Sequence, residues 1–217
     1  MMSCCNRLRE HRCDRMGAVT KAAVPIGNTY DKYGSANPIE RRLMAGFMRR
    51  LEGLLPLTGV TRILEVGVGE GHIAARVRER YPEAEITGID LPDSTLAGHW
   101  KAKQLVGAFA SAERLPFADD AFDLLLAVEV LEHVPNPDKV LAEMARVARH
   151  SAILTVPWEP WWRVANVARG KYLAHLGNTP GHVQHWGRAA FADVVKRHFT
   201  VTACRGSFPW TLVAAQS

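Results

Sequence analysis

The sequence predicts an α/β domain whose core is a doubly wound, mostly parallel sheet of seven strands with an antiparallel last strand. From residue 62 onward, short apolar segments alternate with amphipathic helical patterns, as a parallel sheet covered on both faces requires. Residues 122–128, FDLLLAV, are almost continuously apolar, which is typical of a central strand buried on both faces. A glycine-rich turn follows the first predicted strand, where doubly wound folds bind their ligands.

Length and composition favour a single domain. The chain has 217 residues and is 47% hydrophobic, enough to bury a sizeable core without disulfides or metals. No internal repeat or Gly/Ser-rich linker divides it. We therefore expect one domain over residues 29–217, preceded by a disordered basic extension over residues 1–28.

The sequence shows no membrane or targeting signal, so we expect a cytoplasmic protein. The sequence contains no apolar run approaching the roughly 18 residues of a membrane span, and no signal-peptide pattern, so we expect no stable membrane insertion. Cys4, Cys5 and Cys13 are crowded ahead of the first element and suit reduced thiols rather than a disulfide framework. The net charge of +5 is modest and partly local to the same segment. A nucleic-acid-binding arm or a cysteine metal site is the alternative there, but we expect no nucleic-acid partner.

The first strong helix signal is Asn37-Pro38-Ile39-Glu40, with a cap residue, proline at the first helical position and a glutamate placed for a capping box. Leu43, Phe47 and Leu51 then recur at helical spacing, so this helix should pack on the core until about Pro56.

The remaining elements follow from apolar runs and their periodicity. Strands are predicted at residues 63–66, 85–89, 105–109, 122–128, 151–156, 199–204 and 211–215, the last two around a turn at residues 206–209. Helices are predicted at residues 73–80, 96–101, 191–197 and from the cap at Asn136-Pro137.

A glycine-rich segment carries the strongest functional signal. Residues 65–71 read EVGVGEG between a predicted strand and a predicted helix, where the chain must turn sharply and its backbone must approach a ligand closely. Asp90 ends the second strand, where a carboxylate can accept hydrogen bonds from both hydroxyls of a ribose. The two features together indicate a nucleoside-type cofactor.

Glycine spacing separates two kinds of cofactor. A dinucleotide fingerprint starting at Gly67 would need Gly or Ala where this chain has His72. The alternating glycines preceded by Glu65 instead resemble the first motif of class I S-adenosylmethionine-dependent methyltransferases, which have a Rossmann-like fold. Residues 112–117 (AERLPF), 119–123 (DDAFD) and 130–134 (VLEHV) resemble the ubiquinone/menaquinone-biosynthesis-like, or type 11, group of that family.

The resemblance implies a set of cofactor contacts. Gly67 and Gly69 would lie under the methionine part of S-adenosylmethionine, Asp90 would bind the ribose, and Leu91 would flank the adenine. The cofactor-binding residues expected from the motif and its flanks are Glu65, Gly67, Gly69, Gly71, Asp90, Leu91, Ala112, Glu113 and Tyr30.

Two of these contacts carry an alternative. The family often has an aspartate before Ala112, and this chain has Ser111, so either the Ser111 hydroxyl substitutes or Glu113 takes over. Tyr30 belongs to a segment with Asp31 and Tyr33 that we expect to form an aromatic gate, a helical linker being the alternative.

Methyl transfer is an in-line displacement from a sulfonium cation, so the protein must align the nucleophile, exclude water and, where needed, remove a proton. No metal is required, and we expect none. His133 follows the fourth strand at the mouth of the site and is the first candidate base, although it can also simply brace the loop.

The segment after the fifth strand, residues 157–187, is predicted to be a lid that supplies the substrate pocket. It holds four of the six tryptophans, namely Trp158, Trp161, Trp162 and Trp186, with several basic residues. A turn at residues 178–181 should bring two further candidate bases, His182 and His185, back toward the sheet. The alternatives are that the tryptophans only pack the lid on the body, or that they contact a membrane interface.

The leading hypothesis is a methyltransferase acting on a small molecule such as a natural product, a quinone-like ring or a lipid, with oxygen slightly favoured as the acceptor. The alternatives are an NAD-dependent oxidoreductase, disfavoured by His72, and a scaffold that binds the cofactor without turnover. The sequence leaves the acceptor and the oligomeric state open.

Overall fold

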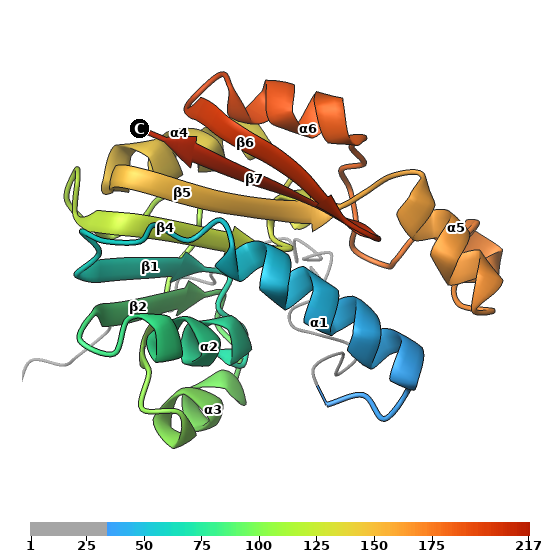
Figure 1. Cartoon of the computed structure of the whole chain (residues 1–217), viewed down its shortest axis with the longest axis horizontal. Helices are drawn as coiled ribbons and strands as arrows, with labels where there is room; N and C mark the ends of the chain where they lie inside the picture. Colours follow the sequence, from blue (N-terminus) through green and yellow to red (C-terminus); the bar gives the residue numbers. More distant parts are fainter. Residues whose placement is uncertain (1–33) are drawn as a thin grey trace, which may run out of the picture.

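The computed structural model describes residues 34–217, which form a seven-stranded sheet with helices on both faces (Figure 1). The strand order is β3-β2-β1-β4-β5-β7-β6, and β7 runs antiparallel to both of its neighbours while the other pairs are parallel. The predicted fold class is therefore confirmed. The expected extension over residues 1–28, its three cysteines, and the gate at Tyr30 and Tyr33 lie outside the described residues.

The described elements have these bounds. The strands are β1 Arg62–Val66, β2 Glu85–Asp90, β3 Val106–Phe109, β4 Phe122–Val128, β5 Ala148–Pro157, β6 Thr200–Ser207 and β7 Trp210–Gln216. The helices are α1 Pro38–Glu52, α2 His72–Arg80, α3 Leu96–Ala102, α4 Pro137–Val147, α5 Trp161–Ala168 and α6 Arg188–Val195, with 3₁₀ turns η1 Leu131–His133 and η2 Leu173–His175.

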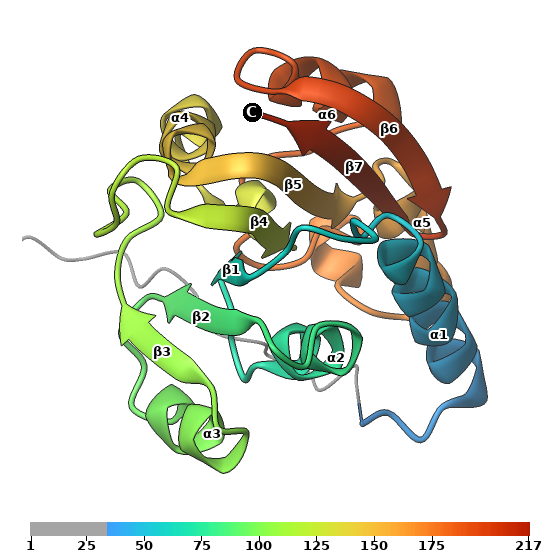
Figure 2. The same ribbon diagram turned by 60° about the vertical axis from the view of Figure 1, so that its left-hand side comes forward.

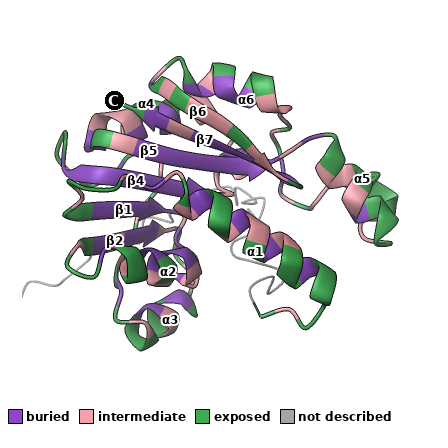
Figure 3. Ribbon diagram, in the orientation of Figure 1, coloured by how far each residue is buried: buried purple, intermediate pink, exposed green. Residues whose placement is uncertain are grey.

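Strand β4 divides the core between the two faces of the sheet. Successive side chains of a strand point to opposite faces, so Leu124 and Leu126 pack with α1, α2 and α3. Leu125 and Ala127 pack with α4 and α6 on the other face. All seven β4 residues are buried, as the colouring of Figure 3 shows. The apolar run had to be a central strand because both of its faces are covered.

The sheet order reverses between β1 and β4, and this reversal positions the functional site. From β1 the chain adds β2 and β3 on one side, whereas β4 and β5 extend the sheet on the other. Val66, the last residue of β1, pairs with Ile89 of β2 and with Ala127 of β4. The turn after β1 therefore lies beside the carboxyl ends of both neighbouring strands, where doubly wound folds bind ligands.

Helix α1 starts where the cap signal predicted, but the capping box does not form. The Asn37 side chain accepts a hydrogen bond from Ile39 N at 2.9 Å. Glu40, expected to reach back to Asn37 N, instead accepts from the Ser35 hydroxyl at 2.6 Å and pairs with Arg169 at 3.4 Å. Ser35 Oγ accepts from Asn37 N in its place. The nearby arginine competes for a carboxylate that sequence spacing alone assigned to the cap.

The insertion between β5 and α6 forms its own small unit. Helix α5 extends beyond the carboxyl end of β5 and lies outside the area of the sheet in Figure 1, whereas in the turned view of Figure 2 it overlaps the ends of β6 and β7. Its contact with the body includes the pairing of Arg169 and Lys171 with Glu40 of α1. None of the helices in the described part of the chain is both long and apolar enough to cross a bilayer.

Truncation of a buried residue of α4 tests whether this helix packs in the core. Leu141 is 0% exposed, so truncating it removes transfer free energy and leaves a cavity. We expect Leu141→Ala to lower the free energy of unfolding by about 2–5 kcal/mol. Leu57→Ala is the matched control because Leu57 is 81% exposed, and it should change stability by less than about 0.5 kcal/mol. Urea titrations measure the free energy of unfolding of both variants. Equal stabilities of the two variants would contradict the packing of α4 on the sheet.

Candidate functional site

The turn after β1 is built from glycines in a conformation that other residues rarely adopt. Gly67, Gly69 and Gly71 have φ angles of +70°, +50° and +77°. The amides of Gly67 and Val68 donate to Ile89 O at 2.8 and 3.0 Å, which fixes the turn against β2. Gly71 then begins α2 in the left-handed conformation, so the sequence pattern reflects backbone geometry as well as ligand approach.

Gly67 also allows a close contact with the segment that follows β4. A Cβ atom on Gly67 would lie 2.3 Å from Cγ2 of Val130, a separation that real side chains do not tolerate. The chain leaving β4 therefore sits directly against the glycine turn. Glu129, just before Val130, has a φ of +56° and accepts from Trp210 Nε1 at 2.9 Å. A non-glycine residue held in this region at a strand end is typical of a functional site.

Asp90 holds the turn from the β2 side. Its carboxylate accepts from Gly69 N and from Leu91 N, each at 2.7 Å. Trp100 adds a second tie, because its Nε1 donates to Gly69 O at 2.7 Å. Burial raises the pKa of Asp90 above its ordinary value, while the two backbone amides act in the opposite direction. The carboxylate is half-buried, so it can still accept hydrogen bonds from a ligand.

Glu65 places a second carboxylate beneath the turn. The residue is 2% exposed, and this burial raises its pKa well above the usual range, although an Ala74 backbone hydrogen bond lowers it. Among the described residues, Oε2 of Glu65 has no hydrogen-bond partner. A buried carboxylate with an oxygen left to pair suits a ligand that carries positive charge.

The residues expected to flank the adenine follow the carboxyl ends of β2 and β3. Leu91 is 37% exposed, and Ala112 is half-buried. Ser111 Oγ accepts from Glu113 N at 3.2 Å, and the Glu113 carboxylate pairs with Lys139 at 3.0 Å. Both groups, the Ser111 hydroxyl and the Glu113 carboxylate, thus already have one polar partner.

The glycine turn forms a site with the half-buried Asp90 and the buried Glu65, and this site fits S-adenosylmethionine. A Cβ at Gly69 would meet no atom within 4 Å, so open space lies over the turn. The acidic pair matches a ligand with ribose hydroxyls and a cationic amino acid part. The structure brings together Glu65, Gly67, Gly69, Gly71 and Asp90 of the expected cofactor set.

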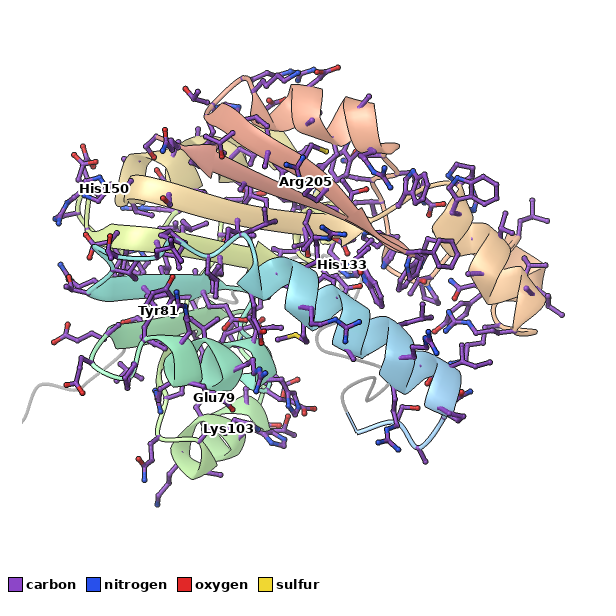
Figure 4. All side chains as sticks on the ribbon, in the orientation of Figure 1. Glu79, Tyr81, Lys103, His133, His150 and Arg205 are labelled. Atoms are coloured by element: carbon purple, nitrogen blue, oxygen red, sulfur yellow. The ribbon has the colours of Figure 1, made fainter. Side chains whose placement is uncertain are left out.

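Two of the three candidate histidines meet at the end of β4. The rings of His133 and His182 lie 4.8 Å apart, edge to face, and His133 Nδ1 is 3.1 Å from Gly181 O. The turn predicted at residues 178–181 is present, with His182 N donating to Thr179 O at 3.1 Å. His185 lies elsewhere: its Nε2 is 2.8 Å from Asn178 Oδ1, and the residue is exposed. Figure 4 labels His133 next to α1 in the view, near the carboxyl ends of the strands.

The tryptophans of the insertion have different surroundings. Trp162 stacks on His182 with ring centroids 6.2 Å apart and donates to Thr179 Oγ1 at 2.9 Å. Trp186 packs on Phe191 in the core, and Trp158 lies under the Arg188 guanidinium at 4.2 Å. Trp161 is 46% exposed. Of these four side chains, Trp162 is the one in ring contact with the histidine pair.

Sequence reasoning missed several residues of the site. Trp100 reaches the turn from α3, and its only signal was its place in a short amphipathic segment. Val130 and Glu132 were noticed within the VLEHV segment but received no role of their own. Glu132 is 1% exposed. The sequence signal for it was an acidic residue just after a strand end, where a buried acid is unusual.

The fold and the glycine turn define a class of protein, namely doubly wound proteins that bind a nucleoside-type cofactor. Comparison with known proteins identifies the family. Residues 64–156 match the family described as "Methyltransferase domain". An O-methyltransferase, rstn1, of Aspergillus nomiae is 30% identical over 163 residues, covering 62% of this chain and 71% of that protein. The chain belongs to the class I S-adenosylmethionine-dependent methyltransferases, in the type 11 group. The oxidoreductase alternative is thereby removed.

Other relatives match a smaller part of their own length. The malonyl-[acyl-carrier protein] O-methyltransferase of Geobacter sulfurreducens is 34% identical over 130 residues, 54% of this chain and 44% of that protein. The 27-O-demethylrifamycin SV methyltransferase of Amycolatopsis mediterranei is 34% identical over 107 residues, 46% and 39% respectively. This chain therefore spans less than half the length of these two relatives.

Solved structures agree on the fold. Magnesium protoporphyrin IX methyltransferase from Synechocystis PCC 6803, determined with bound SAH, superposes with a TM-score of 0.61 at 14% identity, over 84% of this chain and 89% of that one. The [4+2]-cyclase SpnF superposes with a TM-score of 0.60 at 15% identity, over 88% and 86%. Similarity at this level establishes the fold, and the reaction has to be argued from the site.

Asp90 should be essential for cofactor affinity. We expect Asp90→Ala to weaken binding of S-adenosylhomocysteine by about 1.5–3 kcal/mol, because it removes hydrogen bonds to a charged group and one tie of the glycine turn. Asp193→Ala is the control, since Asp193 pairs with Lys196 on α6, away from the site. Isothermal titration calorimetry measures both affinities. Equal affinity of wild type and Asp90→Ala would contradict the assignment of the cofactor site.

Burial of Glu65 should make stability depend on pH. A carboxyl whose pKa is raised in the folded state favours folding below its ordinary pKa of 4.5, and this contribution is lost as pH rises toward the folded value. Between about pH 5 and 8, the wild-type free energy of unfolding should therefore fall relative to Glu65→Gln, by at most about 1.4 kcal/mol per pH unit. Denaturant titrations of both proteins without cofactor test this; parallel pH profiles would show that Glu65 is not desolvated.

Proposed function

We propose that this protein transfers the methyl group of S-adenosylmethionine to a hydroxyl oxygen of a small organic acceptor. Family membership and the fit of the cofactor residues support methyl transfer. Several relatives are named as O-methyltransferases, and one acts on a demethylated rifamycin, which supports oxygen and a natural-product-like acceptor. Quinone-like rings and lipids remain within the same acceptor class.

The observation that carries this proposal is the histidine pair beside the glycine turn. Val130 touches Gly67, and His133 follows three residues later on η1, so the pair is close to the cofactor turn. An imidazole within reach of an acceptor hydroxyl can remove its proton. This geometry favours His133 and His182 as the bases. His185 is exposed, and its ring is hydrogen-bonded to Asn178 instead.

Each group has a defined task in this proposal. Bound cofactor supplies a methyl group on a positively charged sulfur. The glycine turn and Asp90 fix its position, Glu65 complements its positive charge, and Leu91 with Ala112 and Ser111 flank the adenine. His133 and His182 orient the acceptor hydroxyl and accept its proton. Trp162, stacked on His182, keeps that ring oriented and limits the access of water.

The insertion over residues 157–187 acts as the acceptor pocket in this proposal. The support is that His182 and Trp162, which come from this insertion, contact His133 of η1. The proposed partner is thus a small-molecule acceptor without nucleic acid, in a cytoplasmic protein; the cysteine pattern of the sequence, which suits reduced thiols, supports that location. A scaffold without turnover would bind the cofactor equally well but fail a methyl-transfer assay.

Histidine variants test this function. With an acceptor found by screening hydroxylated aromatic and polyketide-like compounds against labelled S-adenosylmethionine, His133→Ala and His182→Ala should each lower kcat by about 10²- to 10⁴-fold, the usual loss for a missing base. His185→Ala should have a smaller effect, and His150→Ala, at the opposite end of the sheet in Figure 4, should have none. Affinity for S-adenosylhomocysteine should stay within about twofold in all four variants. Wild-type kcat in both His133→Ala and His182→Ala would refute the role of the pair.

A further inference from the structure

Three side chains with metal-ligating atoms converge where the insertion meets the end of β4. Glu132, His133 and His182 each offer one ligand atom, and these atoms all lie within 4.8 Å of one another. Glu132 and His133 come from η1, and His182 comes from the insertion 49 residues further along the chain. A carboxylate with two imidazoles is a common ligand set for divalent transition metals.

We propose that Glu132, His133 and His182 bind one divalent transition-metal ion of the Zn²⁺ class, with open positions toward the acceptor pocket. This departs from the expectation that the protein needs no metal. Binding of the ion is independent of the proposed function, whereas its role in catalysis rests on that function.

The backbone holds the two halves of the ligand set together. Val183 N and Gln184 N both donate to Glu132 O, at 2.8 and 3.0 Å. The Gln184 side chain donates to Val134 O at 3.2 Å. The two residues that follow His182 are thus joined to Glu132 and Val134 by hydrogen bonds that do not involve the ligand atoms. Such support outside the ligand shell is what a metal site needs for precise positioning.

The contact between His133 Nδ1 and Gly181 O is compatible with metal binding through the other ring nitrogen, Nε2. Gly181 O can only accept, so the Nδ1 atom 3.1 Å away must carry the hydrogen. In the neutral ring, Nε2 then has the lone pair. Metal-ligating histidines almost always donate their other ring nitrogen to a carbonyl or carboxylate in this way.

His182 and Glu132 are held in an environment that disfavours isolated charge. His182 is 8% exposed and stacks on Trp162, and Glu132 is 1% exposed. Buried charged groups in proteins are paired or coordinate metals. Two imidazoles and one carboxylate carry a net charge of about −1 when the imidazoles are neutral. A divalent cation bound there compensates the carboxylate.

The spacing needs only a modest adjustment for an ion. Ligand bonds of about 2.0–2.2 Å place ligand atoms roughly 3–3.5 Å apart in tetrahedral or octahedral sites. The present separations of up to 4.8 Å therefore have to close by at most roughly 1.3–1.8 Å, which side-chain rotation can supply. His133 is half-buried, so an ion and an acceptor oxygen can reach the open side. Imidazole ligands favour Zn²⁺, Co²⁺ or Fe²⁺ over Mg²⁺.

An ion at this position gives a second way to activate the acceptor. A metal lowers the pKa of a hydroxyl that it binds, so the proton leaves to solvent while the oxygen keeps its electron pair. That pair then forms the O–C bond as the S–C bond of the cofactor breaks, and neutral S-adenosylhomocysteine is released. Under this proposal His133 and His182 act as ligands, and the loss of turnover in their alanine variants comes from loss of the ion.

Calorimetry with Zn²⁺ alone tests the site without cofactor or acceptor. The protein is the full, untagged, chelator-treated chain in which Cys4, Cys5 and Cys13 are changed to Ser, so that thiols cannot hold the ion. We expect one equivalent of Zn²⁺ to bind. Glu132→Gln, His133→Ala and His182→Ala should each weaken binding by at least about 10- to 100-fold, the loss seen even for groups that only support a ligand.

His150→Ala is the matched control, because His150 is an exposed histidine at the other end of the sheet. It should bind Zn²⁺ like the parent, and Mg²⁺ should bind the parent much more weakly than Zn²⁺. Circular dichroism identifies any variant that fails to fold, and Glu132→Gln keeps the backbone carbonyl that holds the insertion. Absorption of Co²⁺ in the visible range provides an independent readout of nitrogen and oxygen ligation.

Absence of one-equivalent binding, or equal Zn²⁺ affinity in the parent and all three ligand variants, overturns the inference. These outcomes are separable from failure of the proposed function. Zn²⁺ binding without methyl transfer to any acceptor would leave the metal site standing and count against the function. Methyl transfer at an unchanged rate in the fully chelated protein, with no Zn²⁺ binding, would establish the function and refute the metal site.

Discussion

The site depends on the absence of a side chain at Gly67. Because no Cβ stands there, Val130 can contact the backbone of the turn, and a Cβ would come within 2.3 Å of it. This contact sets the path of the chain leaving β4 and hence the position of η1 relative to the cofactor cradle. A larger residue at Gly67 would push the two loops apart and, under the proposed function, would separate the methyl donor from the histidine pair.

Burial of acidic groups recurs around this contact. Glu65 beneath the turn is kept in a low-polarity environment that raises its pKa, and Glu132 is buried on the other side of the β4 exit. At Glu65 this placement lowers the stability of the protein without ligand, because a desolvated carboxylate is costly. Under the proposed function the cationic cofactor offsets this cost at Glu65, so that folding stability is exchanged for affinity there.

Under the proposed function, the insertion after β5 contributes through few of its residues. His182 contacts His133 and Trp162 stacks on His182, while hydrogen bonds from Val183 and Gln184 to Glu132 O attach the segment to η1. Much of its outer surface, including Trp161 and Val164, remains exposed. Acceptor preference can therefore vary with the outer part of the insertion, while the part against η1 is constrained by its hydrogen bonds.

Local sequence patterns were enough to predict the fold class, the strand positions and the cofactor turn, because these depend on local periodicity and on glycine conformations that short segments specify. Asp90 belonged to this set, since it ends an apolar strand. The folded chain was needed to show which histidines meet, because His133 and His182 are 49 residues apart and come together through backbone bonds to Glu132. The same holds for Glu40, whose partner Arg169 lies 129 residues away and displaced the predicted capping box. Contacts between distant segments depend on how the elements pack, and no local pattern encodes them.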